Sequence, residues 1–340
     1  MYSLYKPFFL LILIFSTIFT ISANSWVSMW IGLEINLLSF IPLIMEKKNI
    51  RASEATIKYF IIQAMASSII LMMLLSNIVI NSMTSDLITN SPMLVIILSA
   101  LIMKMGAAPF HFWFPEVMEG ISWINALMLL TWQKIAPMTM ILYLNSTNWV
   151  MVSLISSIMV GSILGLNQTS LRKILAYSSI NHMGWMMGAM MLTKSIWIIY
   201  LTFYCLMNTL LILQFKKFNL NHLSQLMITS MNSNTSKWIF ILNFFSLGGI
   251  PPFIGFLPKW LTIQILVENK LIIPSLAMIV ITLITLFYYL RIMLVPMTMK
   301  TTASKVLIKN LQKTPNKLLM STNMGIILSL ALTPTLLSWI

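Results

Sequence analysis

Charged residues are scarce in this 340-residue sequence, at 8% against the roughly 25% that is typical of soluble domains. This scarcity excludes a soluble enzyme of this size, because too little polar surface remains to coat it in water. The sequence has one cysteine, Cys205, which excludes an internal disulfide. One cysteine also cannot ligate an iron–sulfur cluster or a structural zinc on its own.

Several cofactor motifs are missing as well. The sequence has no Walker loop, no dinucleotide-binding fingerprint after a strand, no CxxC pair and no pair of histidines suited to haem. We therefore expect that this chain binds no redox cofactor, nucleotide or metal of its own.

Apolar residues, in contrast, make up 59% of the chain. Apolar runs near the roughly 20-residue length of a bilayer span recur along it. Run length and helix breakers predict an all-α polytopic membrane protein with about eleven transmembrane helices. The predicted spans are residues 7–23, 25–45, 54–80, 92–109, 122–143, 149–167, 172–192, 195–215, 238–266, 273–295 and 318–338.

Basic residues in the predicted connections lie almost entirely on one side of the membrane. Lys194 and Lys270 are the two on the side opposite the N-terminus. The fourteen on the N-terminal side are Lys6, Lys47, Lys48, Arg51, Arg172, Lys173, Lys216, Lys217, Lys237, Lys300, Lys305, Lys309, Lys313 and Lys317. The positive-inside rule therefore places the N-terminus in the cytoplasm or matrix. Most of the net charge of +14 is a topology signal with some attraction to anionic lipid, and we expect no nucleic-acid partner.

A ten-residue motif, G-x-x-P-F-x-x-aromatic-x-P, occurs at residues 106–115 and again at residues 249–258. The two copies fall in the fourth and ninth predicted spans, and this odd separation turns the second copy upside down in the membrane. Inverted repeats with matching broken helices are typical of secondary transporters. The alternative is that Gly and Pro gather in any helix kink.

The motif predicts a division of the chain into three parts. Residues 1–143 form a first five-helix repeat with a broken helix near 104–115. Residues 144–295 form a second, inverted repeat with a broken helix near 248–259. Residues 296–340 add a basic loop and a C-terminal helix.

Five polar residues lie where the predicted connections cannot explain them. Lys104, Lys134, Lys259 and Glu34 fall within spans, where a charge costs at least about 2.5–3.5 kcal/mol, so they are functional candidates. The alternative is a self-neutralising Glu–Lys pair, but one acid cannot pair with three lysines. A buried lysine can release its proton and an arginine cannot, so this set predicts a proton relay. His182, in a polar stripe, is either a member of the relay or a packing residue.

Other charged residues have simpler interpretations. Lys58 follows Glu54 by four residues, so on a helix it can pair with that carboxylate or extend to the interface. Arg291 lies near the end of its span and can do the same. Glu116 and Glu119 lie in a connection on the basic side, either solvated or close to where protons enter.

Several stretches of the sequence together resemble NADH dehydrogenase (ubiquinone) subunit 2 of animal mitochondria, in an arthropod-like form. The match runs in order and spacing from about residue 24 to 295. It is carried by residues 32–37 (GLEINL), 53–60 (SEATIKYF), 104–116 (KMGAAPFHFWFPE), 130–137 (LTWQKIAP), 165–179 (GLNQTSLRKILAYSS), 182–185 (HMGW) and 247–260 (LGGIPPFIGFLPKW).

The resemblance implies an antiporter-like, proton-pumping membrane subunit of respiratory complex I in the mitochondrial inner membrane. In the family pattern Glu34 matches the acidic partner of Lys104, the lysine of the first broken helix. Lys134 matches the central lysine, His182 a histidine that links two half-channels, and Lys259 the lysine of the second broken helix. The bacterial relatives have fourteen helices and the animal subunit lacks the first three, which agrees with eleven spans and an N-terminus in the matrix.

The resemblance also implies partners and cofactors. The partners are other membrane-arm subunits, including neighbouring antiporter-like subunits, and anionic lipids such as cardiolipin. NADH, FMN, iron–sulfur clusters and ubiquinone belong to the assembled complex, so this chain is a subunit of a proton-translocating NADH:ubiquinone reductase without a redox centre. Two alternatives remain: a free-standing cation/proton antiporter, and a structural scaffold whose deep charges are paired and inert.

Overall fold

The computed structural model describes residues 5–46, 49–81, 91–144, 147–230, 234–251 and 253–298. Within these ranges the regular secondary structure is helical, apart from one isolated antiparallel bridge between Ser170 and His222. The predicted C-terminal helix and nearly all of the basic loop before it lie outside these ranges. The chain divides into two compact units, Met1–Ser157 and Ile158–Ile340, and each is described separately.

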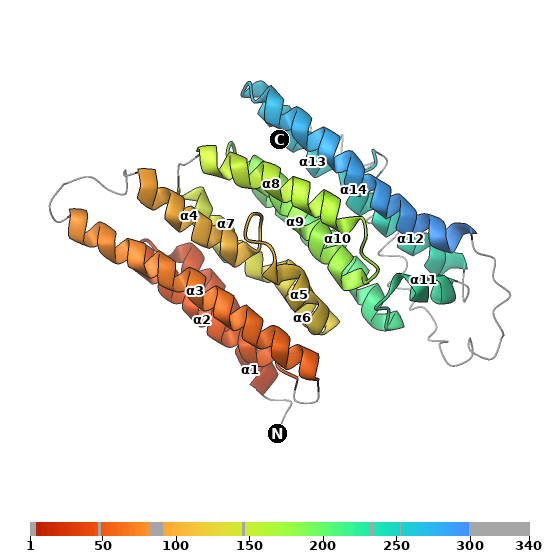
Figure 1. Ribbon diagram of the computed structural model, residues 1–340, viewed down its shortest axis with the longest axis horizontal. Coiled ribbons are helices and arrows are strands. Elements are labelled where there is room, and N and C mark those ends of the chain that lie inside the picture. Colours follow the sequence, from red (N-terminus) through yellow and green to blue (C-terminus); the bar gives the residue numbers. More distant parts are fainter. Residues whose placement is uncertain are drawn as a thin grey trace. The chain divides into compact units, whose positions relative to one another are not determined.

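The first unit contains seven helices and the start of an eighth (Figure 1). They are α1 (Tyr5–Ser22), α2 (Trp26–Ile44), α3 (Ile50–Asn81), α4 (Ser91–Met105), α5 (Trp113–Gly120), α6 (Trp123–Leu130), α7 (Trp132–Leu142) and α8 (Thr147–Gly165). A polar cap fixes where α2 begins, because Ser25 Oγ accepts a hydrogen bond from the backbone N–H of Ser28 at 3.2 Å. The first three helices match the predicted spans to within a few residues.

The second unit is built around α9, which is buried along nearly its whole length. Its described helices are α9 (Leu171–Met190), α10 (Lys194–Phe218), α11 (Leu223–Ser230), α12 (Asn234–Gly248), α13 (Phe256–Glu268) and α14 (Ile272–Thr298). Helices α10, α13 and α14 all contact α9. The helix that carries His182 is therefore enclosed by its neighbours, whereas α14 keeps one face exposed.

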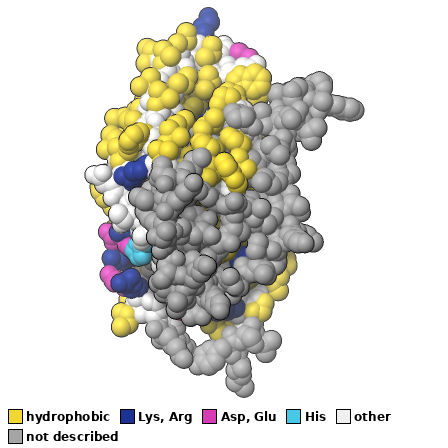
Figure 2. Space-filling view, turned by 90° about the vertical axis from the view of Figure 1, so that its right-hand side faces the viewer, with side chains coloured by type: hydrophobic (Ala, Val, Ile, Leu, Met, Phe, Trp, Pro, Cys, Tyr) yellow, Lys and Arg dark blue, Asp and Glu magenta, His cyan; other side chains and the backbone are white. Residues whose placement is uncertain are grey.

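The exposed faces of the long helices are apolar. Ile273, Phe15 and Met72 are 83%, 68% and 66% exposed, and hydrophobic side chains cover much of the described surface in Figure 2. Six of the described helices are long and apolar enough to cross a membrane, and Pro92–Met105 is a shorter apolar helix. This surface suits lipid, as the sequence predicts. The total of eleven spans remains a prediction.

Helical structure stops at both copies of the repeated motif, between Met105 and Trp113 and between Gly248 and Phe256. A third interruption was not predicted: the span expected over 122–143 is two helices that meet at Thr131. Pro137 lies further along, inside the continuous helix α7, where its missing N–H leaves the Gln133 carbonyl without its helical partner.

Candidate functional site

The first helix break depends on Gly106, whose φ of +73° lies in the left-handed region. A Cβ at this position would come within 2.9 Å of the Cβ of Phe114, so only glycine fits without displacement. The break leaves the last carbonyls of α4 without helical partners. Gln63 Nε2 donates to the Lys104 carbonyl and Trp113 Nε1 to the Met103 carbonyl, each at 3.1 Å. Side chains from α3 and α5 thus hold the broken end in place.

Lys104 lies in the last turn of α4, and its side chain is buried, with 6% of the residue exposed. Lys134 lies in the first turn of α7, just after the interruption at Thr131, and is 2% exposed. The Nζ of Lys134 is 5.6 Å from the centre of the Phe114 ring, a distance at which the ring face attracts a cation.

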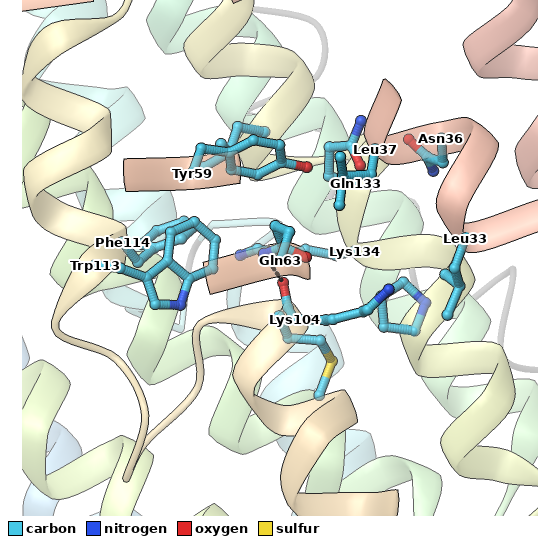
Figure 3. Close-up of a pocket in the computed structure, with 13 residues that line it drawn as sticks. Leu33, Asn36, Leu37, Tyr59, Gln63, Lys104, Trp113, Phe114, Gln133 and Lys134 are labelled. Carbon is cyan, nitrogen blue, oxygen red and sulfur yellow. Dashed lines mark hydrogen bonds between the residues drawn. The ribbon is translucent and has the colours of Figure 1, made fainter. Parts of the chain in front are cut away.

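These two lysines line the same small cavity. Its volume is about 20 Å³, which is enough for one water molecule. Figure 3 shows both lysines at this cavity, with the Gln63 side chain bonded to the Lys104 carbonyl. Asn36 and Gln133 also line this cavity. Their Oδ1 and Nε2 atoms, respectively, are buried and have no hydrogen-bond partner among the described residues. The cavity is therefore lined by two lysines together with residues that carry a buried acceptor and a buried donor.

Glu34 lies on α2, two residues before Asn36, and is partly exposed. Its carboxylate interacts electrostatically with Lys104. The two side chains do not form a direct ion pair, since both salt bridges within 4.0 Å in the described part of the chain involve Lys58. Glu34 is not among the residues that line the cavity.

Lys58 makes those two salt bridges at an exposed groove. Its Nζ lies 3.1 Å from Glu54 Oε1 and 2.9 Å from Glu116 Oε2. Of the two interpretations of Lys58, pairing with Glu54 is the one that the structure shows, and Glu116 on α5 joins the pair. Arg51 and Glu119 line the same groove. With 41% of its side chain exposed, Lys58 differs clearly from the buried lysines.

In the second unit, His182 is 2% exposed on α9. Its Nδ1 lies 2.9 Å from the hydroxyl of Tyr200, within hydrogen-bond distance. Its ring centre is 5.2 Å from that of Tyr204. Both tyrosines belong to α10, where a spacing of four residues places them on one face. Sequence reasoning missed them, although this spacing opposite a polar helix was a signal that could have found them.

Lys259, in the first turn of α13, reaches back to the end of α12. Its Nζ donates a hydrogen bond to the Gly248 carbonyl at 2.9 Å and lies 5.8 Å from the centre of the Trp185 ring. A positive charge is favourable at a helix C-terminus, where carbonyl groups carry partial negative charge. Gly249 has φ +76°, and a Cβ there would meet the Lys259 Nζ at 2.8 Å. The second break is therefore built around its lysine.

The five predicted residues thus fall into two local groups. Glu34, Lys104 and Lys134 belong to the first unit, where the two lysines share a cavity. His182 and Lys259 belong to the second unit. Helix α9 links them, because it carries His182 and, three residues later, the Trp185 that contacts Lys259. Among the described residues no group of three or more His, Cys, Asp or Glu side chains could hold a metal ion.

The fold and the site place the chain in the class of polytopic helical membrane proteins that have buried lysines beside broken helices. Broken helices of this kind are typical of secondary transporters. Residues 23–285 match the family model for NADH:quinone oxidoreductase/Mrp antiporter, TM. NADH-ubiquinone oxidoreductase chain 2 of Anopheles gambiae is 50% identical over 286 residues, which cover 84% of this chain and 83% of the relative. The same protein of Squalus acanthias is 38% identical over 94% of each chain. The chain belongs to the NADH-ubiquinone oxidoreductase chain 2 family.

Solved structures share the fold. A chain in respiratory complex I from Thermus thermophilus superposes with a TM-score of 0.84 at 23% identity, covering 98% of this chain and 79% of that one. A chain of the Mrp complex from Dietzia sp. gives a TM-score of 0.74 at 19% identity, covering 84% of this chain and 59% of that one. At these identities the likeness shows the fold alone.

Proposed function

We propose that this chain is an antiporter-like, proton-translocating membrane subunit of respiratory complex I in the mitochondrial inner membrane. Electron transfer in other subunits drives it, and it carries protons through a relay of lysine, glutamate and histidine side chains. The observation that carries the proposal is the shared cavity of Lys104 and Lys134, which are 6% and 2% exposed. Two buried lysines at one cavity repel each other when both are charged, so the charge of one depends on that of the other.

The relay alternates between protonated states. In the first unit the negative charge of Glu34 favours the protonated form of Lys104. When coupling to electron transfer weakens that effect, Lys104 releases its proton towards Lys134 through a water in the cavity, held by Asn36 and Gln133. His182 and Lys259 continue the relay in the second unit.

The charge distribution and the family support the direction of transport and its setting. The excess of basic residues supports a matrix-side N-terminus, with protons moving from the matrix to the intermembrane space. The partners are other membrane-arm subunits, including neighbouring antiporter-like ones, and anionic lipids such as cardiolipin near the basic connections. NADH, FMN, the iron–sulfur clusters and ubiquinone are bound elsewhere in the complex.

The test is the Lys134→Met substitution in complex I that has been purified and reconstituted into vesicles, with protons translocated per NADH oxidised as the readout. We expect the yield to fall, because methionine fills the space without carrying a proton. The yield should fall in Lys134→Arg as well, because arginine does not release its proton. Lys216→Met, at an exposed lysine of α10, is the matched control. A native yield in Lys134→Met would refute the role of Lys134.

The free-standing antiporter is distinguished by purification, since the matching family also includes Mrp antiporters. A subunit of complex I should copurify with flavin and iron–sulfur proteins in a fixed ratio after mild detergent extraction. A separate antiporter would leave the membrane as its own oligomer, without those proteins.

A further inference from the structure

Four tyrosines are buried together in the second unit, and the relay described above uses none of them. They are Tyr200 and Tyr204 on α10 and Tyr288 and Tyr289 on α14, each at most 1% exposed. Burying a hydroxyl removes it from water, and phenylalanine would fill the same space without that cost. Tyrosine at the membrane surface keeps its hydroxyl in contact with water. Packing alone therefore does not explain four buried hydroxyls.

The hydroxyls converge on the polar face of α9. The Tyr200 hydroxyl lies 2.9 Å from His182 Nδ1. The Tyr204 hydroxyl interacts with the side chain of Ser179, one turn before His182 on the same helix. The Tyr289 hydroxyl interacts with the side chain of Ser178, next to Ser179. The Tyr200 hydroxyl thus reaches His182 directly, while those of Tyr204 and Tyr289 lie near two serines of the same helix.

The fourth tyrosine extends this group. Tyr288 and Tyr289 have ring centres 4.5 Å apart, and their hydroxyls interact with each other. Neither hydroxyl, however, makes a direct hydrogen bond of standard geometry to another described residue. Buried polar atoms are rarely left in this state without a bridging water or a functional reason. Each of these two hydroxyls can therefore still donate and accept a hydrogen bond, as a proton path requires.

We propose that the four tyrosines and the two serines form a hydroxyl relay that carries protons between His182 and α14. The inference rests on the proposed function, since it extends the path of the second unit. At each step a hydroxyl oxygen accepts a proton from one neighbour and releases its own to the next, so an O–H bond forms as another breaks. No group changes its net charge after a proton has passed and the hydroxyls have reoriented. Water bridges the hydroxyls that are not in direct contact.

Tyr200 has a particular place in this relay, because its hydroxyl lies within hydrogen-bond distance of Nδ1 of His182. The contact fixes the orientation of the imidazole ring and gives its Nδ1 a partner for proton exchange. The Tyr204 ring, 5.2 Å from that of His182, limits movement of the imidazole. The ring contacts would survive loss of the hydroxyls, whereas proton exchange would not.

The experiment removes hydroxyls one at a time. Tyr200→Phe on α10 and Tyr289→Phe on α14 are introduced separately into the whole complex, which is purified and reconstituted. We expect the proton yield per NADH to fall in each variant by as much as it falls in Lys134→Met. The rate of NADH oxidation by the uncoupled complex should stay unchanged. Tyr143→Phe, at a 51% exposed position, is the matched control and should keep the native yield. Counting protons per NADH corrects for incomplete assembly.

Two further comparisons separate the relay from a structural role and from the proposed function. The double variant Lys134→Met with Tyr200→Phe should lose no more protons than either single variant, because both interrupt one path. An additive loss would overturn the relay. Native yields in both tyrosine variants, with a reduced yield in Lys134→Met, would also overturn it while leaving the proposed function intact. A native yield in Lys134→Met would count against the proposed function itself.

Discussion

The Nζ of Lys259 donates a hydrogen bond to the backbone carbonyl of Gly248 at 2.9 Å, which joins the two halves of the second broken helix. A lysine that carries protons here would therefore also hold the end of α12. Release of its proton weakens this bond, because a neutral amine is a poorer donor than an ammonium. The proton state of Lys259 and the geometry of the break are therefore coupled.

Lys259→Met tests this coupling. We expect the substitution to lower the proton yield per NADH, because methionine has no proton to pass on. It should also lower the stability of the membrane arm, because the Gly248 carbonyl loses its partner, at a cost of about 1–3 kcal/mol. The measurements are proton yield and the temperature at which the purified complex loses activity. Lys216→Met is the control for removal of a lysine, and unchanged values in Lys259→Met would contradict both roles.

Alanine at the two left-handed glycines should destabilise the fold. The left-handed conformation costs an alanine about 1–2 kcal/mol, and steric contacts add to this. Gly106→Ala should be the worse of the two, because its new Cβ meets the fixed Cβ of Phe114 at 2.9 Å. At Gly249 the Cβ meets the mobile end of Lys259 at 2.8 Å, which can move at the expense of its hydrogen bond.

Gly248→Ala is the matched control for both substitutions. Gly248 ends a helix without a left-handed φ, and its Cβ would make only an ordinary contact of 3.7 Å with Tyr289. Alanine there should be neutral or slightly stabilising, since it favours helix more than glycine does. The measurement is the amount of assembled complex in membranes, compared among the three variants. Equal amounts in all three would show that neither glycine is needed for its conformation.

The sequence predicted best what depends on neighbouring residues. The repeated motif located both helix breaks, because glycine and proline determine the local backbone. The four-residue spacing of Glu54 and Lys58 allowed an ion pair as one of two interpretations, and the structure contains it. The break at Thr131 was missed because it lies inside a long apolar run, which was predicted as a single span over residues 122–143.

Contacts between distant segments could not be predicted in this way. Nothing local indicated that Glu116 pairs with Lys58, or that tyrosines of two helices meet α9. The repeat itself is only partly symmetric: its offset of 143 residues aligns Lys259 with Glu116, not with Lys104. The backbone break is shared by the two copies, whereas the charged group beside each break depends on the surroundings of that copy.

Lys58 should be dispensable for proton transfer, although it is charged and lies on a membrane-spanning helix. Its side chain is 41% exposed, and exposed ion pairs contribute little to stability. We expect Lys58→Met to leave the proton yield per NADH unchanged, while Lys104→Met, on the same assay, lowers it. A reduced yield in Lys58→Met would instead place the groove with Glu54 and Glu116 on the proton path.

The polar lining of the first-unit cavity should control how fast protons pass between Lys104 and Lys134. Gln133→Leu removes a buried donor and Asn36→Leu a buried acceptor, neither of which has a hydrogen-bond partner among the described residues. Leucine at either position leaves a water in the 20 Å³ cavity with fewer polar groups to hold it. We therefore expect slower coupled turnover and a lower proton yield in both variants.

Gln264→Leu is the matched control for this prediction, because Gln264 is exposed and bonds only to Glu268 at 3.1 Å among the described residues. It should keep the native turnover and yield. The comparison with uncoupled NADH oxidation separates proton transfer from assembly, since that rate depends on electron transfer in other subunits. If Gln133→Leu and Asn36→Leu pump as well as Gln264→Leu, then protons do not cross this cavity through water, and Lys104 and Lys134 must exchange protons by another route.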